Sequence, residues 1–289
     1  MNWVKNVWTP SGTSLTSNAI TAQENVACYP DDIPFEDGPC NDCDNPCTTH
    51  KQTLDKVPSN WPPKLEESEG SLAAMLDSIG KSAGQRLGYR VLMTAVEVPV
   101  PSSGSAEPLL RKDEVLILPD LVAVGPVTTT DDSHGRGLEE YLVTGEAPAW
   151  MSVRSVSAWK NVNINSSRNP GSAEALSSAE NEADNSGGLT ACILVCAHKL
   201  RDKRCGVAGP MLIESLQHTC LNKGLQEKVV VLACSHIGGH KFAGNIIVYS
   251  DLGGHWYGRV KPCHSDAIID THVVGGKVFK ELWRGRMDV

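Results

Sequence analysis

Two pairs of metal-binding residue types constrain this chain more than any other feature of its sequence. Cys196 and Cys205 have eight residues between them, and His236 and His240 have three. Each pair follows a short, uncharged run that is rich in β-branched residues, which is typical of a strand buried on both faces. Four side chains that bind soft metals are therefore expected at the ends of two buried strands.

The two apolar runs, 191–195 and 229–233, are separated by a helical pattern. Pro210 suits the first turn of that helix and Gly224 suits its C-terminal cap, so we expect the order strand, loop, helix, strand. In a right-handed βαβ unit, the loops after parallel strands open on the same edge of the sheet. The two ligand loops are therefore predicted to converge.

Thiolate together with imidazole favours zinc or an iron–sulfur cluster over calcium or magnesium. Structural Cys2His2 zinc sites usually space their cysteines two to four residues apart, whereas eight residues intervene here. A two-iron cluster with two thiolates and two imidazoles fits this wider loop. A zinc-stabilised binding module that uses the same four residues is the alternative.

At these residues the sequence resembles the thioredoxin-like [2Fe-2S] ferredoxins of the sucrase/ferredoxin-like family. The resemblance covers roughly the last hundred residues and lies in the segments 196–210, 236–245, 256–260, 275–277 and 282–285. It implies that Cys196 and Cys205 bind one iron and that His236 and His240 bind the other. It also implies an α/β fold in which a C-terminal thioredoxin-like [2Fe-2S] domain follows a reduced, thioredoxin-like N-terminal domain. The sequence shows no paired carboxylates placed for glycoside hydrolysis, so the word sucrase finds no support.

Further residues near the ligands have two readings. The backbone of Gly238 and Gly239 either hydrogen-bonds to cluster sulfur or only makes a turn. Lys199, Arg201 and Arg204 either favour thiolates and steer an acidic redox partner or form a solvated loop. His198 is a weak competitor for ligation because it lies two residues from Cys196. A structural role in packing is predicted for Cys192, Cys220, Cys234 and Cys263.

A second cysteine group near the N-terminus comprises Cys28, Cys40, Cys43 and Cys47. Cys40 and Cys43 form a Cys-x-x-Cys pair, which binds zinc or acts as a dithiol in some proteins. The proline and aspartate residues around the pair are equally typical of a loop without a fixed function. A thiol oxidoreductase that uses Cys40 and Cys43 is therefore a further alternative function.

Composition shifts along the chain divide it into four regions. Residues 1–27 show no period and are predicted to be disordered; residues 28–150 hold the cysteine-rich entry and a degenerate thioredoxin-like domain. Residues 151–187 are rich in Ser, Asn and Gly and are predicted to be a flexible linker, because such a segment buries too little apolar surface. Residues 188–289 form the ferredoxin domain, which we expect to fold alone.

The predicted elements of the first domain are a helix at 71–79 closed by Gly80 and strands at 89–98, 114–118 and 121–124. The Ser-rich stretch at 99–112 stands where the family has a crossover helix, so that helix is expected to be missing. In the second domain, a strand at 244–249 and a helix at 265–274 complete a β-α-β-β-α order.

Charge and cysteine usage limit the partners and the compartment. A formal charge of −8 and a pI near 5.6 give no reason to expect nucleic acid as a partner. No apolar run approaches the 18 residues of a membrane span. Ten cysteines without a secretory signal favour a reducing compartment. We expect the cytoplasm, with mitochondria as the alternative.

The predicted function is single-electron transfer in redox homeostasis, by a carrier rather than a self-contained enzyme. Because imidazole donates less charge than thiolate, such clusters have potentials of roughly −150 to +300 mV rather than about −400 mV. An imidazole ligand also keeps an ionisable N–H, so we expect electron and proton uptake to be coupled. The electron donor and acceptor are unknown, and the sequence leaves the oligomeric state open.

Overall fold

The computed structural model describes residues 2–8, 33–36, 61–98, 108–156 and 188–287. Most of its strands join one ten-stranded sheet. In sheet order these strands are β12 (Trp283–Met287), β10 (Gly253–Tyr257), β9 (Ile246–Ser250), β7 (Ala191–Cys196), β8 (Val229–Cys234), β3 (Arg90–Glu97), β1 (Asn2–Trp8), β4 (Val115–Ile117), β5 (Val122–Gly125) and β6 (Ser152–Ser155). The helices are α1 (Leu72–Leu87), α2 (Asp132–Thr144), α3 (Lys203–Asn222) and α4 (Ser265–Ile268), which a π-helical segment, Ile269–Val274, continues. A separate pair joins β2 (Phe35–Glu36) to β11 (Val278–Phe279).

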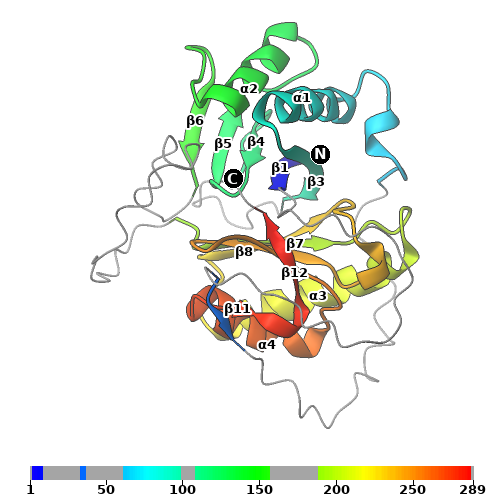
Figure 1. Ribbon diagram of the computed structural model, residues 1–289, viewed down its shortest axis with the longest axis vertical. Helices are drawn as coiled ribbons and strands as arrows, with labels where there is room; N and C mark the ends of the chain where they lie inside the picture. The colour runs from blue at the N-terminus through cyan, green and yellow to red at the C-terminus, as the bar shows by residue number, and fades with distance from the viewer. Residues whose placement is uncertain (1, 9–32, 37–60, 99–107, 157–187, 288–289) are drawn as a thin grey trace.

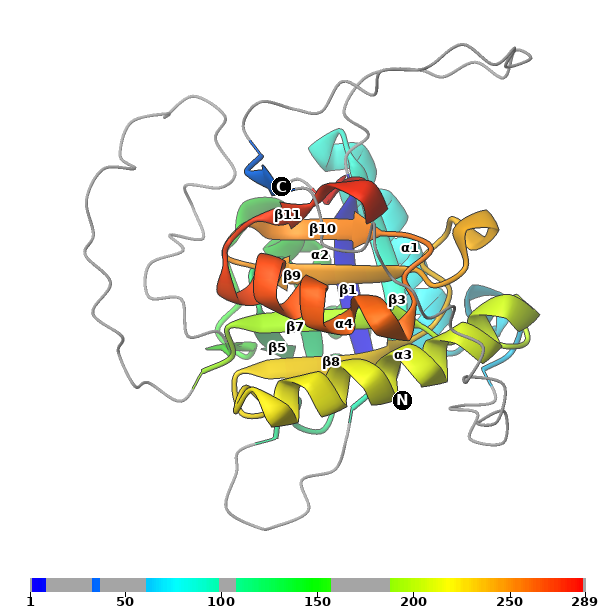
Figure 2. The same cartoon turned by 90° about the horizontal axis from the view of Figure 1, so that it is seen from below.

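The sheet bends at the β3–β8 pair, so the two halves of the chain stack as layers. In Figure 1 the N-terminal half lies above and the C-terminal half below, with α1 and α2 on one outer side and α3 and α4 on the other. In Figure 2, α3 and α4 lie in front of β7 to β10, and β1 runs crosswise behind them. Separate apolar clusters fill the space under each helix layer and the space between the half-sheets. The molecule is therefore a four-layer α/β/β/α arrangement.

The C-terminal half contains the five predicted elements as β7, α3, β8, β9 and α4, but a further strand, β10, stands between β9 and α4. Strands β7 and β8 are parallel, β9 runs antiparallel to β7, and β10 runs antiparallel to β9. Alternation along β7 sends Ile193 and Val195 towards the helices, and it sends Cys192, Leu194 and Cys196 towards the other half of the chain. Strands β10 and β12 have no counterpart in the predicted order.

Helix α3 begins earlier than the sequence predicts. Its N-cap is Asp202, whose carboxylate accepts the backbone N–H of Arg204 at 2.9 Å. The prediction that Pro210 starts the helix is wrong, because Pro210 lies inside it. The early start places Cys205 in the first turn of α3 rather than in a loop.

Helix α1 extends beyond Gly80, so the prediction that Gly80 ends this helix is wrong. Gly80 and Gly84 instead let the helix lie close to β3, since a methyl group at Gly84 would lie 2.8 Å from the carbonyl oxygen of Tyr89. The helix ends at Gly88, whose φ of 77° is the left-handed conformation of a C-terminal cap. The three predicted strands of this half correspond to β3, β4 and β5.

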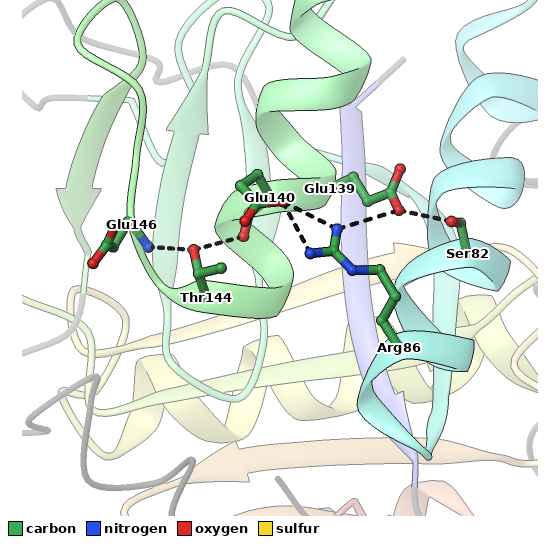
Figure 3. Close-up of polar contacts among 6 residues, drawn as sticks. All are labelled: Ser82, Arg86, Glu139, Glu140, Thr144 and Glu146. Carbon is green, nitrogen blue, oxygen red and sulfur yellow. Dashed lines mark hydrogen bonds and ion pairs between the residues drawn. The ribbon is translucent and has the colours of Figure 1, made fainter.

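Polar contacts join α1 to α2 on the outer surface (Figure 3). Ser82 Oγ donates to Glu139 Oε1 at 2.6 Å, and both terminal nitrogens of Arg86 donate to Glu140 Oε2 at 3.0 Å. Thr144 Oγ1 donates to the carbonyl oxygen of Glu140 at 2.9 Å and closes the end of α2. Helix α2 runs for 13 residues, from the residue after its N-cap Asp131 to the residue before the left-handed Gly145.

Two predicted flexible regions contain strands. The prediction of disorder for residues 1–27 is wrong for Asn2–Trp8, which forms β1 between β3 and β4. The linker prediction for 151–187 is wrong for Ser152–Ser155, which forms β6 on the edge of β5. Pairing with distant strands supplies the hydrogen bonds that local sequence did not reveal. Residues 9–27 and 157–187 lie outside the described residues.

Candidate metal centre

Cys196 and Cys205 meet at the C-terminal end of β7. Cys196 is the last residue of β7, Cys205 lies in the first turn of α3, and both are buried. A methyl group at Gly209 would lie 2.6 Å from the carbonyl oxygen of Cys196, so this glycine permits the helix to approach the strand. Most of the residues between the two cysteines form the turn that joins β7 to α3.

The environment of Cys196 stabilises a thiolate. A hydrogen bond from Cys205 lowers the pKa of Cys196 well below its usual value, and bonds from the His236 side chain and the backbone of His198 and Ile237 add to this against the effect of burial. The same contact and burial raise the pKa of Cys205. Cys196 is therefore the more easily ionised of the two thiols, and the His236 side chain lies within hydrogen-bonding reach of it.

The loop after β8 carries His236. Gly238 and Gly239 have φ values of 90° and 60°, which make its turn. The side-chain amide of Asn245 donates to the carbonyl oxygens of both glycines, at 3.1 and 2.9 Å. The ring of Trp256 lies against the turn, where a methyl group at Gly239 would lie 2.6 Å from Cζ2. The turn-making role of the glycines is thus evident, and hydrogen bonding to a cluster stays a prediction.

His198 ties the ligand loops to the N-terminal half. Its Nδ1 accepts the backbone N–H of His236 at 3.2 Å, so Nε2 carries the proton and donates to the carbonyl oxygen of Pro62 at 3.0 Å. Burial lowers the pKa of this imidazole. Trp61 packs edge-on against the ring, with centroids 5.8 Å apart. Both ring nitrogens are engaged, which agrees with the low expectation of ligation.

Ser235 makes a second connection to the N-terminal half. Its backbone N–H donates to the carbonyl oxygen of Ala95 at 2.8 Å, and its Oγ accepts the N–H of Ala95 at 3.0 Å. These bonds extend the short β3–β8 pairing, which is limited to Val96 with Cys234 and Glu97 with Ala233. The loop that carries His236 is therefore fixed from both halves of the chain.

A cleft of about 980 Å³ opens beside this loop. Helix α1 and β3 form one wall, and the loop 235–239 with Trp256 forms the other. His198, Arg201 and His236 reach it. The candidate centre therefore borders a cleft between the two halves.

Other predicted residues divide into several groups. Lys199, Arg201 and Arg204 are exposed beside the centre, and Arg204 pairs with Asp202 at 2.8 Å. Cys192, Cys220 and Cys234 are buried, with burial raising the pKa of Cys192 to about 12 and that of Cys220 to about 11, whereas Cys263 is exposed. The side chain of His240 and the whole group Cys28, Cys40, Cys43 and Cys47 lie outside the described residues.

The side chains of Cys196, Cys205 and His236 are donors of the types that the predicted metal centre needs. Hydrogen bonds from Cys205 and His236 to Cys196 bring together thiol and imidazole, which are the donor types that a centre with soft ligands uses. Among the side chains that the structure describes, no three His, Cys, Asp or Glu residues form a group arranged to hold a metal ion. His240, the fourth predicted ligand, is not among those side chains.

Asn245, Ser235 and Trp256 support the site without having been predicted. Asn245 is fully buried and follows the ligand loop by five residues, so a polar residue before the apolar run 246–249 was the available signal. The backbone of Asn245 also accepts the N–H of Cys196 at 3.0 Å. No sequence signal distinguishes Ser235, because its partner, Ala95, lies 140 positions away in the chain.

One protein family matches most of this chain. The sucrase/ferredoxin-like family model matches residues 45–285. The chain belongs to this family. A relative from Debaryomyces hansenii, altered inheritance of mitochondria protein 32, is 31% identical over 240 residues, which are 78% of this chain and 77% of the relative. The protein of the same name from Clavispora lusitaniae is 39% identical over 95 residues, 32% of this chain and 34% of that relative.

A solved thioredoxin-like [2Fe-2S] ferredoxin from Aquifex aeolicus aligns with 35% of this family member and 96% of its own chain. The identity is 19% and the TM-score is 0.31, so no argument rests on this alignment. Within the described residues, no helix is long and apolar enough to cross a membrane.

Proposed function

We propose that this chain is a one-electron carrier with a [2Fe-2S] cluster held by Cys196, Cys205, His236 and His240. The observation that carries the proposal is the meeting of both cysteines with His236 around a stabilised thiolate. Membership of the sucrase/ferredoxin-like family supports it. The C-terminal half is, in this proposal, a thioredoxin-like module, and the N-terminal half is a reduced version of the same module.

Each residue has a part in this proposal. Cys196 and Cys205 supply thiolates, and His236 and His240 supply neutral imidazoles. His198 holds the His236 backbone, and Asn245 holds the turn after it. The cluster, when bound, takes up and releases one electron. Because the protein positions ligands and supplies no reacting carboxylate pair, we propose a carrier rather than a self-contained enzyme.

Replacing Cys196 with Ser tests this proposal, because a hydroxyl does not replace the soft thiolate. We expect wild-type protein purified anaerobically to be red-brown. It should contain about two iron ions and about two sulfide ions per chain, which is the stoichiometry of a two-iron cluster. Cys196→Ser and Cys205→Ser should lose at least most of the iron and the visible absorption. Cys263→Ser is the matched control, since Cys263 is exposed and should leave the spectrum unchanged.

The same measurement separates the alternatives. A colourless protein that holds one zinc through Cys196 would establish the zinc-stabilised module instead. Iron retained in full by Cys196→Ser would contradict the ligand assignment. The thiol oxidoreductase alternative is tested by Cys40→Ser, which should leave iron content unchanged under our proposal. We assign the protein to the cytoplasm, and cell fractionation distinguishes this from the mitochondrial alternative.

A further inference from the structure

A cluster of positive charge surrounds one aromatic ring beside the predicted ligand His240. Phe242 ends the short helical turn His240–Phe242 and is half-buried. Three exposed cations lie over its ring: Lys241 Nζ is 4.9 Å from the ring centroid, Arg259 Cζ is 5.2 Å from it, and Arg284 Cζ is 4.9 Å from it. We call these four residues the basic cluster.

The cations come from three separate segments that meet at one edge of the sheet. The backbone N–H of Arg259 donates to the carbonyl oxygen of Phe242 at 3.0 Å, and the N–H of Gly258 donates to that of Leu282 at 2.9 Å. Arg259 adopts a φ of 61°, which costs an L-residue roughly 1 kcal/mol or more. The gathering is therefore a product of the fold and not of a basic run in the sequence.

Like charges at this separation repel, and cation–π attraction of roughly 0.5–1 kcal/mol per exposed pair offsets only part of that. No ion pair joins Lys241 or Arg259 to another residue in the described part of the chain. Elsewhere on the surface, Lys81, Lys223 and Lys277 each pair with a carboxylate, at 2.6, 2.8 and 3.0 Å. Lys241 and Arg259 thus keep their positive charge available to an external anion.

The charge of the basic cluster is opposite in sign to the net charge of the whole chain. It has the same sign as the charges that are exposed between Cys196 and Cys205. The protein has a formal charge of −8, yet the loop before α3 exposes Lys199 and Arg201, and the first residue of α3, Lys203, is also exposed. Cys196 and His236 thus lie between loops whose exposed charges are positive, Asp202 being the partner of Arg204. Such asymmetry steers an acidic partner to this edge and raises its association rate.

We propose that the basic cluster is the docking surface for the acidic face of a protein redox partner. Aromatic residues and arginine are enriched at protein–protein interfaces, in which the ring supplies apolar contact and the charged rim supplies direction. A transient redox contact needs less buried area than a stable complex. That the partner is a redox protein rests on the proposed function; the acidity of its face rests on the cluster alone.

The test measures binding of a flavodoxin, used as a strongly acidic redox probe, to the full-length protein. We expect a weak complex at about 10 mM ionic strength that is largely lost at about 150 mM, because the Debye length falls from roughly 30 Å to 8 Å. Lys241→Glu combined with Arg259→Glu should weaken binding tenfold or more. Lys228→Glu is the matched control: Lys228 is exposed directly before β8, at the end of that strand away from the ligand loop, and its variant should bind within twofold of wild type.

Lys241→Gln combined with Arg259→Gln keeps the test valid if charge reversal impairs folding, and it should weaken binding by a smaller factor. Equal weakening by Lys228→Glu, or no binding at low ionic strength, would overturn the docking surface. Binding of the same face to vesicles of anionic phospholipid, with none to flavodoxin, would also overturn it. Because binding needs no iron, a colourless protein that binds flavodoxin through these residues would support the docking surface while contradicting the proposed cluster.

Discussion

At the scale of single residues, the site depends on which atoms hold protons. The hydrogen bond from Cys205, with those from His236 and two backbone groups, lowers the pKa of Cys196, whereas the same contact raises the pKa of Cys205. His198 is fixed as the Nε2–H tautomer by the His236 backbone and by Pro62. His236 is the described imidazole that would carry a proton coupled to electron uptake.

Proton coupling predicts how the reduction potential varies with pH. Reduction adds negative charge, so the reduced form should hold the free ring proton of His236 or His240 more tightly, and its pKa should be higher than in the oxidised form. Between the two pKa values the potential should fall as pH rises, by up to about 59 mV per unit for one electron. Below both values it should be flat.

A redox titration across neutral to alkaline pH checks this prediction. His236→Cys should lower the potential and reduce its pH dependence, because a thiolate ligand carries no such proton. The exposed residue His218, on α3, offers His218→Gln as a control that should behave as wild type. A wild-type potential that does not change over the whole range would remove the coupling from the proposal.

At the scale of elements, glycines decide how closely segments approach the site. Gly209 lets α3 reach the end of β7, and Gly239 lets the ligand loop lie under Trp256. In both places a methyl group would fall within 3 Å of a rigid neighbour, the backbone at Gly209 and an indole ring at Gly239. The positions of Cys205 and His236 follow from these two contacts.

Gly239→Ala tests the loop, with Gly276→Ala as its matched control. Both glycines have φ near 60°, so both variants should lose roughly 1–2 kcal/mol of unfolding free energy. Only Gly239→Ala should lose a further 1–3 kcal/mol or so from overpacking, because the space around Gly276 is open. Denaturant melts compare the two. Equal losses would show that Trp256 moves away freely and does not hold the loop.

At the scale of the whole molecule, the two halves are joined more closely than a linker between two domains would imply. The inner face of the C-terminal half-sheet carries the fully buried residues Cys192, Leu194, Leu232, Ile247 and Tyr249. Residues of the N-terminal half, among them Leu116 and Leu118, pack in the same apolar cluster. The candidate centre lies at the border of this shared core, since Cys196 and Cys205 belong to it.

The shared core changes the expectation for a fragment that begins at residue 188. The sequence alone predicts that the fragment folds and holds its cluster. The fragment would expose the apolar face of the shared core to water, at a free-energy cost of about 25 cal/mol per Å², so we expect it to aggregate or to lack iron. Solubility and iron content of the fragment are compared with those of a full-length variant that has Ser at Cys28, Cys40, Cys43 and Cys47. That variant should keep its iron. A soluble fragment with the wild-type spectrum would show that the C-terminal half is autonomous.

The sequence by itself determined the elements and the candidate ligands wherever the signal was local. The apolar runs at 191–195 and 229–233 became β7 and β8, because continuous β-branched runs suit only buried strands. Family membership, which the segments around Cys196 and His236 indicated, is confirmed. These features depend on residues that lie close together in the chain.

Only the tertiary structure decided which distant segments meet. Residues 2–8 look unstructured because their strand is stabilised by pairing with β3 and β4, whose positions local periodicity does not report. The bond between His198 and Pro62 joins residues 136 positions apart, and the bond between Ala95 and Ser235 spans 140. Hydrogen bonds and packing act through space, and a local sequence pattern records only half of each such contact.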